Sequence, residues 1–545
     1  RELVSLVELG GDTKLLSERF SGAFTAVNPR GALADIHFFS NFDGSGIRVV
    51  SLIEGVALDA YLGVPAINRI DGLLSLSPRR GYLDINNEAF EMDFRSMFSQ
   101  SWPFSSGRGR VGYELVDGQF SVHSGLIELK NGELKGLGKI SLNLPSDRSK
   151  QTWGLSLGVV NAQLLDARRY IPTTISQDLV GWLDQAIQAG RVSESGLLFH
   201  GALFRGAPSI RKAHDLYFEV EEAILRYEPE WPPLTELGSQ VHINNYFVNA
   251  SSDDGRVLSS DLVRVTALAP IRTDGSVDTI RVDAEATGPF GDAIRVLNET
   301  PLKDSTNHVA QHWHAQGQMT AMLKLDVPIG SRVDDEVHSE VRLTYSDASL
   351  AMPEFDLKID DLYGTATYNN ESGLNSSGFT GITFQRPVDG TIRSSVSGAT
   401  GEIVVELTGA IDAKELYEWS DQILLSRGDG ELAYRAVVHA PYGVNSDEGY
   451  VEASSDLVGF TLALPHPLGK ADANSSRRFE YRQVFLEPGY RVEMSLDETV
   501  RAALKISEGI VQGGRVHFGA DAFGAVAFDG IRMTGELGNV DFAQW

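Results

Sequence analysis

A recurring alternation of apolar and polar residues is the sequence feature that most constrains this fold. Apolar Ile280, Val282 and Ala284 are separated by charged residues, and the same period of two recurs at 319–327 and 490–496. Successive side chains of a β-strand point to opposite faces, so each stretch has one apolar face and one polar face. This pattern predicts antiparallel sheet that is packed on one side only.

Three segments depart from the alternation and carry apolar residues at helical spacing. The predicted helices run from about Ser176 to Ala189, from Thr300-Pro301 through Trp313, and from Asp412 through Ile423. A glycine follows each helix in a predicted turn that feeds an apolar strand. The three glycines, Gly196, Gly317 and Gly430, are 121 and 113 residues apart. We therefore predict a repeat of roughly 115 residues, each with one helix and a long antiparallel meander.

The repeat divides the chain into four predicted parts. These are an N-terminal β-groove segment at 1–170, repeats at 171–296 and 297–407, and a final repeat with the C-terminal strands at 408–545. Units of half-buried sheet cannot each close a core of their own, so we expect them to stack edge to edge and share one apolar face.

The length of the chain sets how much apolar surface this sheet must cover. The 545 residues allow about 35–45 strands, and sheets of more than about ten strands curl or split. We therefore predict a mostly β fold: a strongly curled, elongated antiparallel sheet with an open apolar trough and a few short helices. Three short helices cannot cover so many strands, so either the sheet folds over itself or an apolar ligand fills the trough.

Composition excludes several classes of function. The net charge of −27 repels a phosphate backbone, so nucleic acid is not an expected partner. The absence of cysteine rules out disulfides, thiolate metal sites and cysteine nucleophiles. No apolar run approaches the roughly 18–20 residues of a membrane-spanning helix. Because the chain begins at Arg1 without an export signal, we expect it to be a piece of a longer protein whose anchor lies outside it.

Catalytic and cofactor motifs are weak throughout. A G-x-G-x-x-G pattern at 107–112 is flanked by predicted strands and not by a helix, so we expect a turn and no dinucleotide site. His308 and His312 have the spacing of helical zinc ligands, but no third ligand is evident and no Glu lies between them. We therefore expect no enzyme activity, no cofactor and no metal.

An ordered set of short segments resembles the YhdP-like branch of the AsmA-like (TamB/YdbH/YhdP) family of Gram-negative bacteria. The segments are Arg169-Tyr170-Ile171-Pro172, the helix around 179–187, residues 196–204, the run from Tyr227 to Leu234, Ser455–Phe460 and Leu464–Lys470. The resemblance covers most of the chain and is strongest at about 160–270 and 410–500.

The resemblance implies a repeating β-groove that carries phospholipid between the inner and outer membranes. It implies a periplasmic segment of a protein that is anchored in the inner membrane, with membrane contacts through parts outside this segment. It brings no catalytic residues. The candidate lipid-binding residues on the groove face are Ile280, Val282, Ala284, Met319, Leu323, Leu325, Val341, Leu343, Val405, Leu407, Tyr434, Val438, Val492 and Met494.

Three alternatives remain open at this point. An outer-membrane β-barrel also alternates and lacks cysteine, although the predicted helices and the C-terminal residues 539–545 do not fit one. A structural scaffold of the cell envelope that transports nothing requires a dry, fully packed sheet interior. A polysaccharide-active β-solenoid requires an acidic cleft with aromatic platforms.

Overall fold

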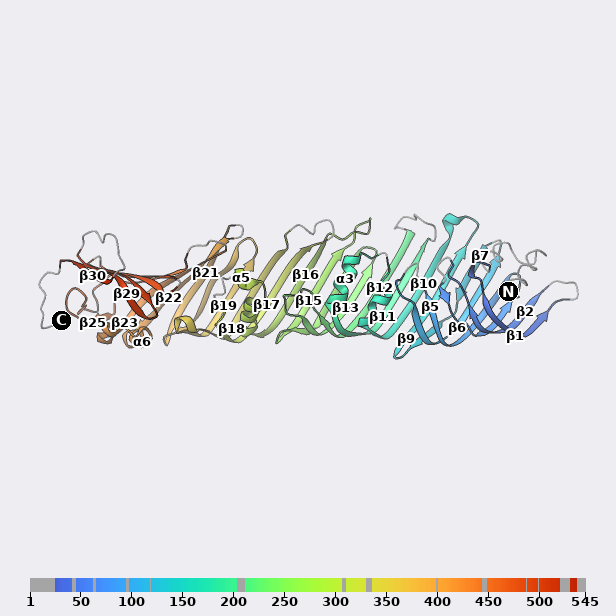
Figure 1. Cartoon of the computed structure of the whole chain (residues 1–545), viewed down its shortest axis with the longest axis horizontal. Coiled ribbons are helices and arrows are strands. Elements are labelled where there is room, and N and C mark those ends of the chain that lie inside the picture. The colour runs from blue at the N-terminus through green and yellow to red at the C-terminus, as the bar shows by residue number, and fades with distance from the viewer. Residues whose placement is uncertain are drawn as a thin grey trace.

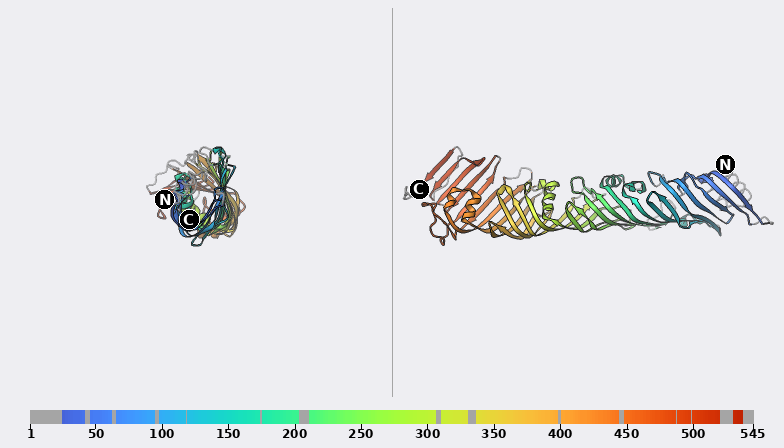
Figure 2. Two further views of the ribbon diagram at one scale, coloured as in Figure 1. Left: turned by 90° about the vertical axis from the view of Figure 1, so that its right-hand side faces the viewer. Right: turned by 90° about the horizontal axis from the view of Figure 1, so that it is seen from below.

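The computed structural model shows one long sheet whose strands lie slanted across the long axis of the molecule (Figure 1). The structure describes residues 25–41, 46–61, 65–94, 98–117, 119–173, 175–202, 211–305, 310–329, 336–397, 400–443, 448–486, 488–497, 499–519 and 530–536. Within these residues the sheet holds 30 strands. Seen along the long axis, the strands follow a strongly curved path (Figure 2, left). The predicted fold class is confirmed.

The strands of the first half are β1 (Arg30–Phe39), β2 (Arg48–Ala57), β3 (Ala66–Ile67), β4 (Gly72–Leu76), β5 (Arg80–Asp93), β6 (Trp102–Val116), β7 (Gln119–Ser124), β8 (Ile127–Asn131), β9 (Leu134–Leu144), β10 (Thr152–Gln163), β11 (Ile187–Ala202), β12 (Lys212–Leu225), β13 (Leu234–Asn244), β14 (Phe247–Val257) and β15 (Ser260–Pro270).

The strands of the second half are β16 (Thr279–Pro289), β17 (His314–Pro328), β18 (His338–Met352), β19 (Leu357–Asn369), β20 (Gly373–Thr383), β21 (Arg386–Ser397), β22 (Thr400–Asp412), β23 (Gly428–Tyr442), β24 (Tyr450–Ser455), β25 (Phe460–Leu462), β26 (Phe479–Phe485), β27 (Tyr490–Leu496), β28 (Val500–Ser507), β29 (Ile510–Phe518) and β30 (Gly530–Gly535).

The helices are short. The α-helices are α3 (Gln177–Ala186), α4 (Phe290–Glu299), α5 (Leu302–Ser305) and α6 (Ala413–Ser420). The 3₁₀ helices are η1 (Arg148–Lys150), η2 (Leu164–Tyr170), η5 (Pro353–Phe355) and η6 (Ile423–Arg427).

The sheet is a meander in which order along the chain is order in space. Each strand from β9 to β23 pairs with the next one, and every pairing there is antiparallel. Towards the ends, β7 and β8 both lie between β6 and β9, and β24 connects β23 to β26. The pairing of β29 with β30 is parallel.

The connections between strands form two different rims along the central part of the sheet. The helical rim carries the connections that contain η2, α3, α4, α5, η5 and α6, together with residues 226–233. The hairpin rim lies at the other ends of the same strands and carries connections such as 145–151, 245–246 and 271–278. Each strand therefore runs from one rim to the other.

β-Bulges cluster near the helical rim. Register shifts lie around Gly190 in β11 and Glu222 in β12, and again around Gly317 in β17 and Asp347 in β18. All four residues have positive φ, at 133°, 53°, 100° and 48° respectively. Each bulge inserts an extra residue that bends its strand and increases the local twist. A row of bulges along one rim therefore accounts for part of the curl of the sheet.

Two of the three predicted helices are confirmed in position. Ser176 caps α3 by accepting a hydrogen bond from Leu179 N at 3.3 Å, and Asp412 caps α6 by accepting one from Lys414 N at 2.9 Å. Both helices end earlier than predicted, at Ala186 and Ser420.

The second predicted helix is confirmed only at its start, where the one-turn helix α5 begins at Leu302, and its predicted end at Trp313 is wrong. Residues 306–309 lie outside the described residues. The prediction also missed α4, which lies before Thr300. This helix begins directly where β16 ends, so the alternating pattern of the strand hides the start of the helix. The Thr300 hydroxyl closes α4 by donating to Val296 O at 2.7 Å, and it also accepts from Leu302 N at 3.3 Å at the start of the one-turn helix α5. Trp313 directly precedes β17 and lies in no helix.

The marker glycines are also misplaced by the prediction. Gly196, Gly317 and Gly430 lie inside β11, β17 and β23 and not in turns, because each strand begins before its glycine. The motif at 107–112 likewise lies within β6. A Cβ atom at Gly107 would lie 2.7 Å from the Phe90 ring, so this glycine makes room for an aromatic neighbour.

The Gly317→Ala variant tests the bulge account. A Cβ atom there would lie 2.4 Å from Ala348 Cα and 2.5 Å from Asp347 O, at a φ of +100°. We expect the local free energy of opening of β17 and β18 to fall by about 2 kcal/mol or more, measured by amide hydrogen exchange.

Gly196→Ala is the matched control, because nothing lies within 4 Å of its Cβ position and its φ is not positive. We expect it to change stability by less than about 1 kcal/mol. Equal effects of the two substitutions would contradict the account.

Candidate functional site

The pairing register carries one face of the sheet continuously from strand to strand. Paired residues of antiparallel strands share a face. Ala284 of β16 pairs with Leu323 of β17, which pairs with Val341 of β18. We call the face that carries these residues the apolar face. Followed from pair to pair, the register places all fourteen predicted residues on it: Ile280, Val282, Ala284, Met319, Leu323, Leu325, Val341, Leu343, Val405, Leu407, Tyr434, Val438, Val492 and Met494.

The apolar face extends well beyond the predicted residues toward the N-terminal end. Leu157 of β10 pairs with Leu197 of β11, which pairs with Leu216 of β12 and so with Ile243 of β13. Sequence reasoning missed these residues, although each lies in an alternating stretch. Gly and Ser interrupt the apolar positions there, as at Ser195, and weaken the pattern.

The opposite face is polar and carries cross-strand ion pairs. Arg281 Nε lies 3.3 Å from Asp326 Oδ1, and Arg435 Nε lies 2.7 Å from Glu406 Oε1. The hydrogen bond from Arg435 holds the pKa of Glu406 below its usual value. These pairs are solvent-exposed and add little stability. They mark this face of the sheet as the one that faces water.

Burial along the apolar face is uneven. Buried residues concentrate near the helical rim, where Tyr345, Ala348 and Met352 form part of one cluster and Ile411 and Leu432 form part of another. Nearer the hairpin rim, apolar residues of the same strands are only half-buried. Of the fourteen predicted residues, Met319 and Val492 are buried and the other twelve are half-buried. The face is therefore packed along one rim and open along the rest of its width.

Helix α4 covers the apolar face at the helical rim. The Phe290 ring stacks on Tyr345 with ring centroids 5.0 Å apart. The buried carboxylate of Asp292 accepts hydrogen bonds from Ser259 N at 2.9 Å and Ser260 Oγ at 2.8 Å, which fixes the helix to the connection of β14 and β15. α6 has the same role further along, where Leu416 packs against Ile411.

Several tyrosines on the apolar face have a raised pKa because their hydroxyl groups are shielded from water. Burial raises the pKa of Tyr345, Tyr434 and Tyr481 to about 12. Tyr113, near the N-terminal end, also has a pKa of about 12, because burial outweighs its hydrogen bond to Ser77 O. Desolvation therefore disfavours ionisation of a phenol at four separate strands of this face.

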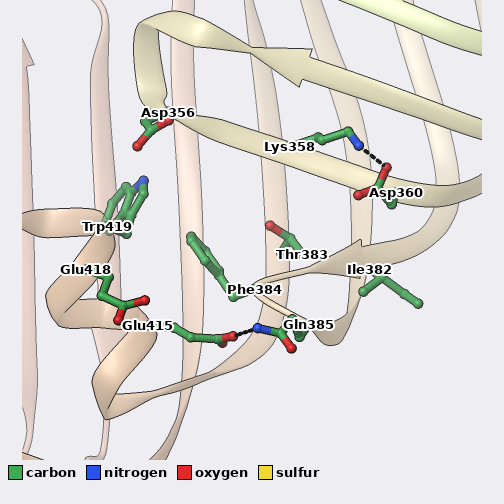
Figure 3. A pocket seen from close by; sticks show the side chains of 10 residues that line it. All are labelled: Asp356, Lys358, Asp360, Ile382, Thr383, Phe384, Gln385, Glu415, Glu418 and Trp419. Atoms are coloured by element: carbon green, nitrogen blue, oxygen red, sulfur yellow. Dashed lines mark hydrogen bonds and ion pairs between the residues drawn. The ribbon is translucent and has the colours of Figure 1, made fainter.

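A small pocket of about 460 Å³ lies at the helical rim, outside the apolar face (Figure 3). Its lining combines four carboxylates with apolar and aromatic side chains: Asp356, Lys358, Asp360, Ile382, Thr383, Phe384, Gln385, Glu415, Glu418 and Trp419. Lys358 lies 2.7 Å from Asp360, and Gln385 donates a hydrogen bond to Glu415. The arrangement offers no nucleophile with an adjacent base.

Of the two histidine candidates, only His312 lies within the described residues. His308 lies outside these residues, and His314 begins strand β17. In the described part of the chain, no three His, Asp or Glu side chains gather in an arrangement that could hold a metal ion. Within the same residues, no helix is both long enough and apolar enough to cross a bilayer.

Comparison with known proteins identifies relatives. The profile of the family described as YhdP protein matches residues 2–545. The intermembrane phospholipid transporter YhdP of Escherichia coli (strain K12) is 25% identical over 425 residues, which cover 75% of this chain and 32% of that protein. The chain therefore spans about a third of the length of this relative. No solved structure matches.

The raised tyrosine pKa values predict a loss of stability at alkaline pH. The unfolded state releases its phenol proton near pH 10, and the folded state near pH 12. The stabilisation is therefore complete below pH 10 and is lost as pH rises to 12. We expect Tyr345→Phe, which keeps the ring stack on Phe290, to reduce this loss by about 1–2 kcal/mol in urea unfolding. Titration of all 16 tyrosines as one class near pH 10 would contradict the prediction.

Proposed function

This chain belongs to the YhdP family, and we propose on that premise that it is a segment of a lipid-transfer bridge. In this proposal, phospholipid acyl chains bind along the apolar face and move along it between the inner and outer membranes. The segment lies in the periplasm, and the parts of the protein that contact the two membranes lie outside it. The name of the E. coli relative, an intermembrane phospholipid transporter, supports this assignment.

The half-exposed apolar face is the observation that carries the proposal. A hydrocarbon chain needs a continuous apolar lining and no reacting side chain. Each buried CH₂ group contributes about 0.8 kcal/mol, so an acyl chain of ordinary length is held firmly by such a face. A phospholipid also has a polar headgroup that must stay in water. An open trough accommodates both requirements, because the chains lie inside and the headgroup remains at the mouth.

Movement along the face follows from its repetition. Neighbouring strands present apolar residues at corresponding levels, as in Ala284, Leu323 and Val341 along one paired row and Val282 and Leu325 along the next. A lipid that slides by one strand exchanges one set of apolar contacts for a similar set. The free-energy profile of a lipid along the trough is therefore shallow. Net movement of lipid in one direction requires a concentration gradient or another protein that supplies energy.

The main alternative is a structural scaffold that binds no lipid. A scaffold requires an apolar face that is sealed by protein. Half-burial of residues such as Leu323, Val341 and Val405 disfavours it, because exposed apolar area of this extent lowers solubility unless a ligand covers it.

Leu323→Asp and Met322→Asp form a matched pair that tests the proposal. The two residues are adjacent on β17 and point to opposite faces, and Met322 is 48% exposed. We expect Leu323→Asp to weaken binding of a fluorescent phospholipid by about tenfold, because a charged group displaces apolar contacts worth about two CH₂ groups. Met322→Asp should bind as the unmodified chain does.

Circular dichroism establishes that both variants remain folded. If folded Leu323→Asp binds lipid as tightly as Met322→Asp, the apolar face is not the binding surface and the proposal fails.

A further inference from the structure

We infer that the phosphate headgroups of bound lipids lie along the hairpin rim at strands β9–β12, where Lys212 and the cations of the η1 turn meet a pair of aromatic rings. The inference rests on the proposed function and adds an orientation to it: the headgroup side of the trough is the hairpin rim and not the helical rim.

Packing already excludes the helical rim as the mouth of the trough. On β18, Met352, Ala348 and Tyr345 are buried, and Val341, further from this rim, is half-buried. Helix α4 covers the same end of the strand through the contact of Phe290 with Tyr345. The uncovered part of the face is therefore the part that reaches the hairpin rim.

Charge also disfavours a phosphate at the pocket on the helical rim. The pocket on this rim brings the carboxylates of Asp356, Asp360, Glu415 and Glu418 together around one lysine, Lys358 (Figure 3). A phosphodiester placed beside four carboxylates is repelled, and at short range this repulsion is only partly screened by salt.

The hairpin rim carries aromatic rings at the edge of the apolar face. Trp153 and Phe199 are the second and fourth residues from this rim on β10 and β11, and their ring centroids are 4.7 Å apart. Both side chains are half-buried. Tyr113 and Phe120 form a similar pair on β6 and β7, with centroids 5.9 Å apart. Amphipathic aromatic rings favour the boundary between hydrocarbon and headgroup.

Lys212 places a cation directly above the first aromatic pair. It pairs with Gly201, so its side chain belongs to the same face as Phe199. A Cβ atom at Gly201 would lie 3.1 Å from both Lys212 Cγ and Phe199 Cζ, which shows that the lysine stem and the ring are neighbours. Lys212 is exposed and makes no ion pair with any described residue. Its stem can lie on apolar surface while the ammonium group stays in water.

Further cations flank this position in a chain whose net charge is −27. The η1 turn, which precedes Trp153, carries Arg148 and Lys150, and only Lys150 has a nearby carboxylate, Asp147 at 3.9 Å. The turn before β5 carries Arg79, whose backbone oxygen accepts a hydrogen bond from Leu115 N, two residues along β6 from Tyr113. Basic side chains above paired aromatics are suited to a phosphodiester whose acyl chains continue downward along Leu155 and Leu157.

Lys212→Glu tests the inference against Lys139→Glu. Both substitutions change the net charge equally, but Lys139 pairs with Ser156 and lies on the polar face. The probes are fluorescent phosphatidylethanolamine and diacylglycerol with the same acyl chains, each offered to the 545-residue chain in phosphatidylcholine vesicles. The two probes differ only in the headgroup, which is phosphoethanolamine in one and a free hydroxyl in the other.

We expect the unmodified chain to prefer phosphatidylethanolamine over diacylglycerol by about threefold to tenfold. Lys212→Glu should abolish this preference without weakening diacylglycerol binding, and Lys139→Glu should retain it. If Lys212→Glu retains the preference, or weakens both probes equally, the headgroup assignment is overturned while the proposed function stands. If the unmodified chain binds neither probe, the proposed function itself is overturned.

Discussion

The hydrogen-bond register between neighbouring antiparallel strands is the constraint on which the rest of this structure depends. Side chains alternate with a period of two, so a slip of one residue would move every apolar side chain of a strand to the polar face. The register of β16 and β17 has no shift between its first pair, Thr279 with Pro328, and its last pair, Pro289 with Gln318. Because paired residues share a face, the short apolar rows of successive strands join into one continuous face. The sheet that carries this face extends along the length of the molecule (Figure 2, right).

The tightly packed core of the sheet lies towards one of its two rims. Bulges, helices and buried clusters lie at the helical rim, where they bend the sheet and supply most of its tightly packed core. This arrangement lets the hairpin side of the apolar face remain half-exposed without unfolding the sheet. Under the proposed function, stability and lipid binding thus depend on different parts of the same strands.

Sequence alternation predicted the fold class and the shared face because both depend on a local period of two. It placed residues as distant as Ile280 and Met494 on one face, which the register confirms. It missed α4, because the helix starts where a strand pattern ends, and it assigned Gly317 to a turn although the glycine serves a bulge. The unequal burial of the two rims depends on tertiary packing of helices such as α4, which no local pattern reports. Whether the fourteen residues contact lipid remains a prediction.

Native mass spectrometry of the chain, purified from Gram-negative cells without detergent, tests the central claim most directly. The account predicts that the apolar face does not stay empty in cells, so the purified chain should carry phospholipid, with more than one molecule per chain because the face repeats along the molecule. A mass equal to that of the 545-residue polypeptide alone, with no lipid released on denaturation, would contradict the account.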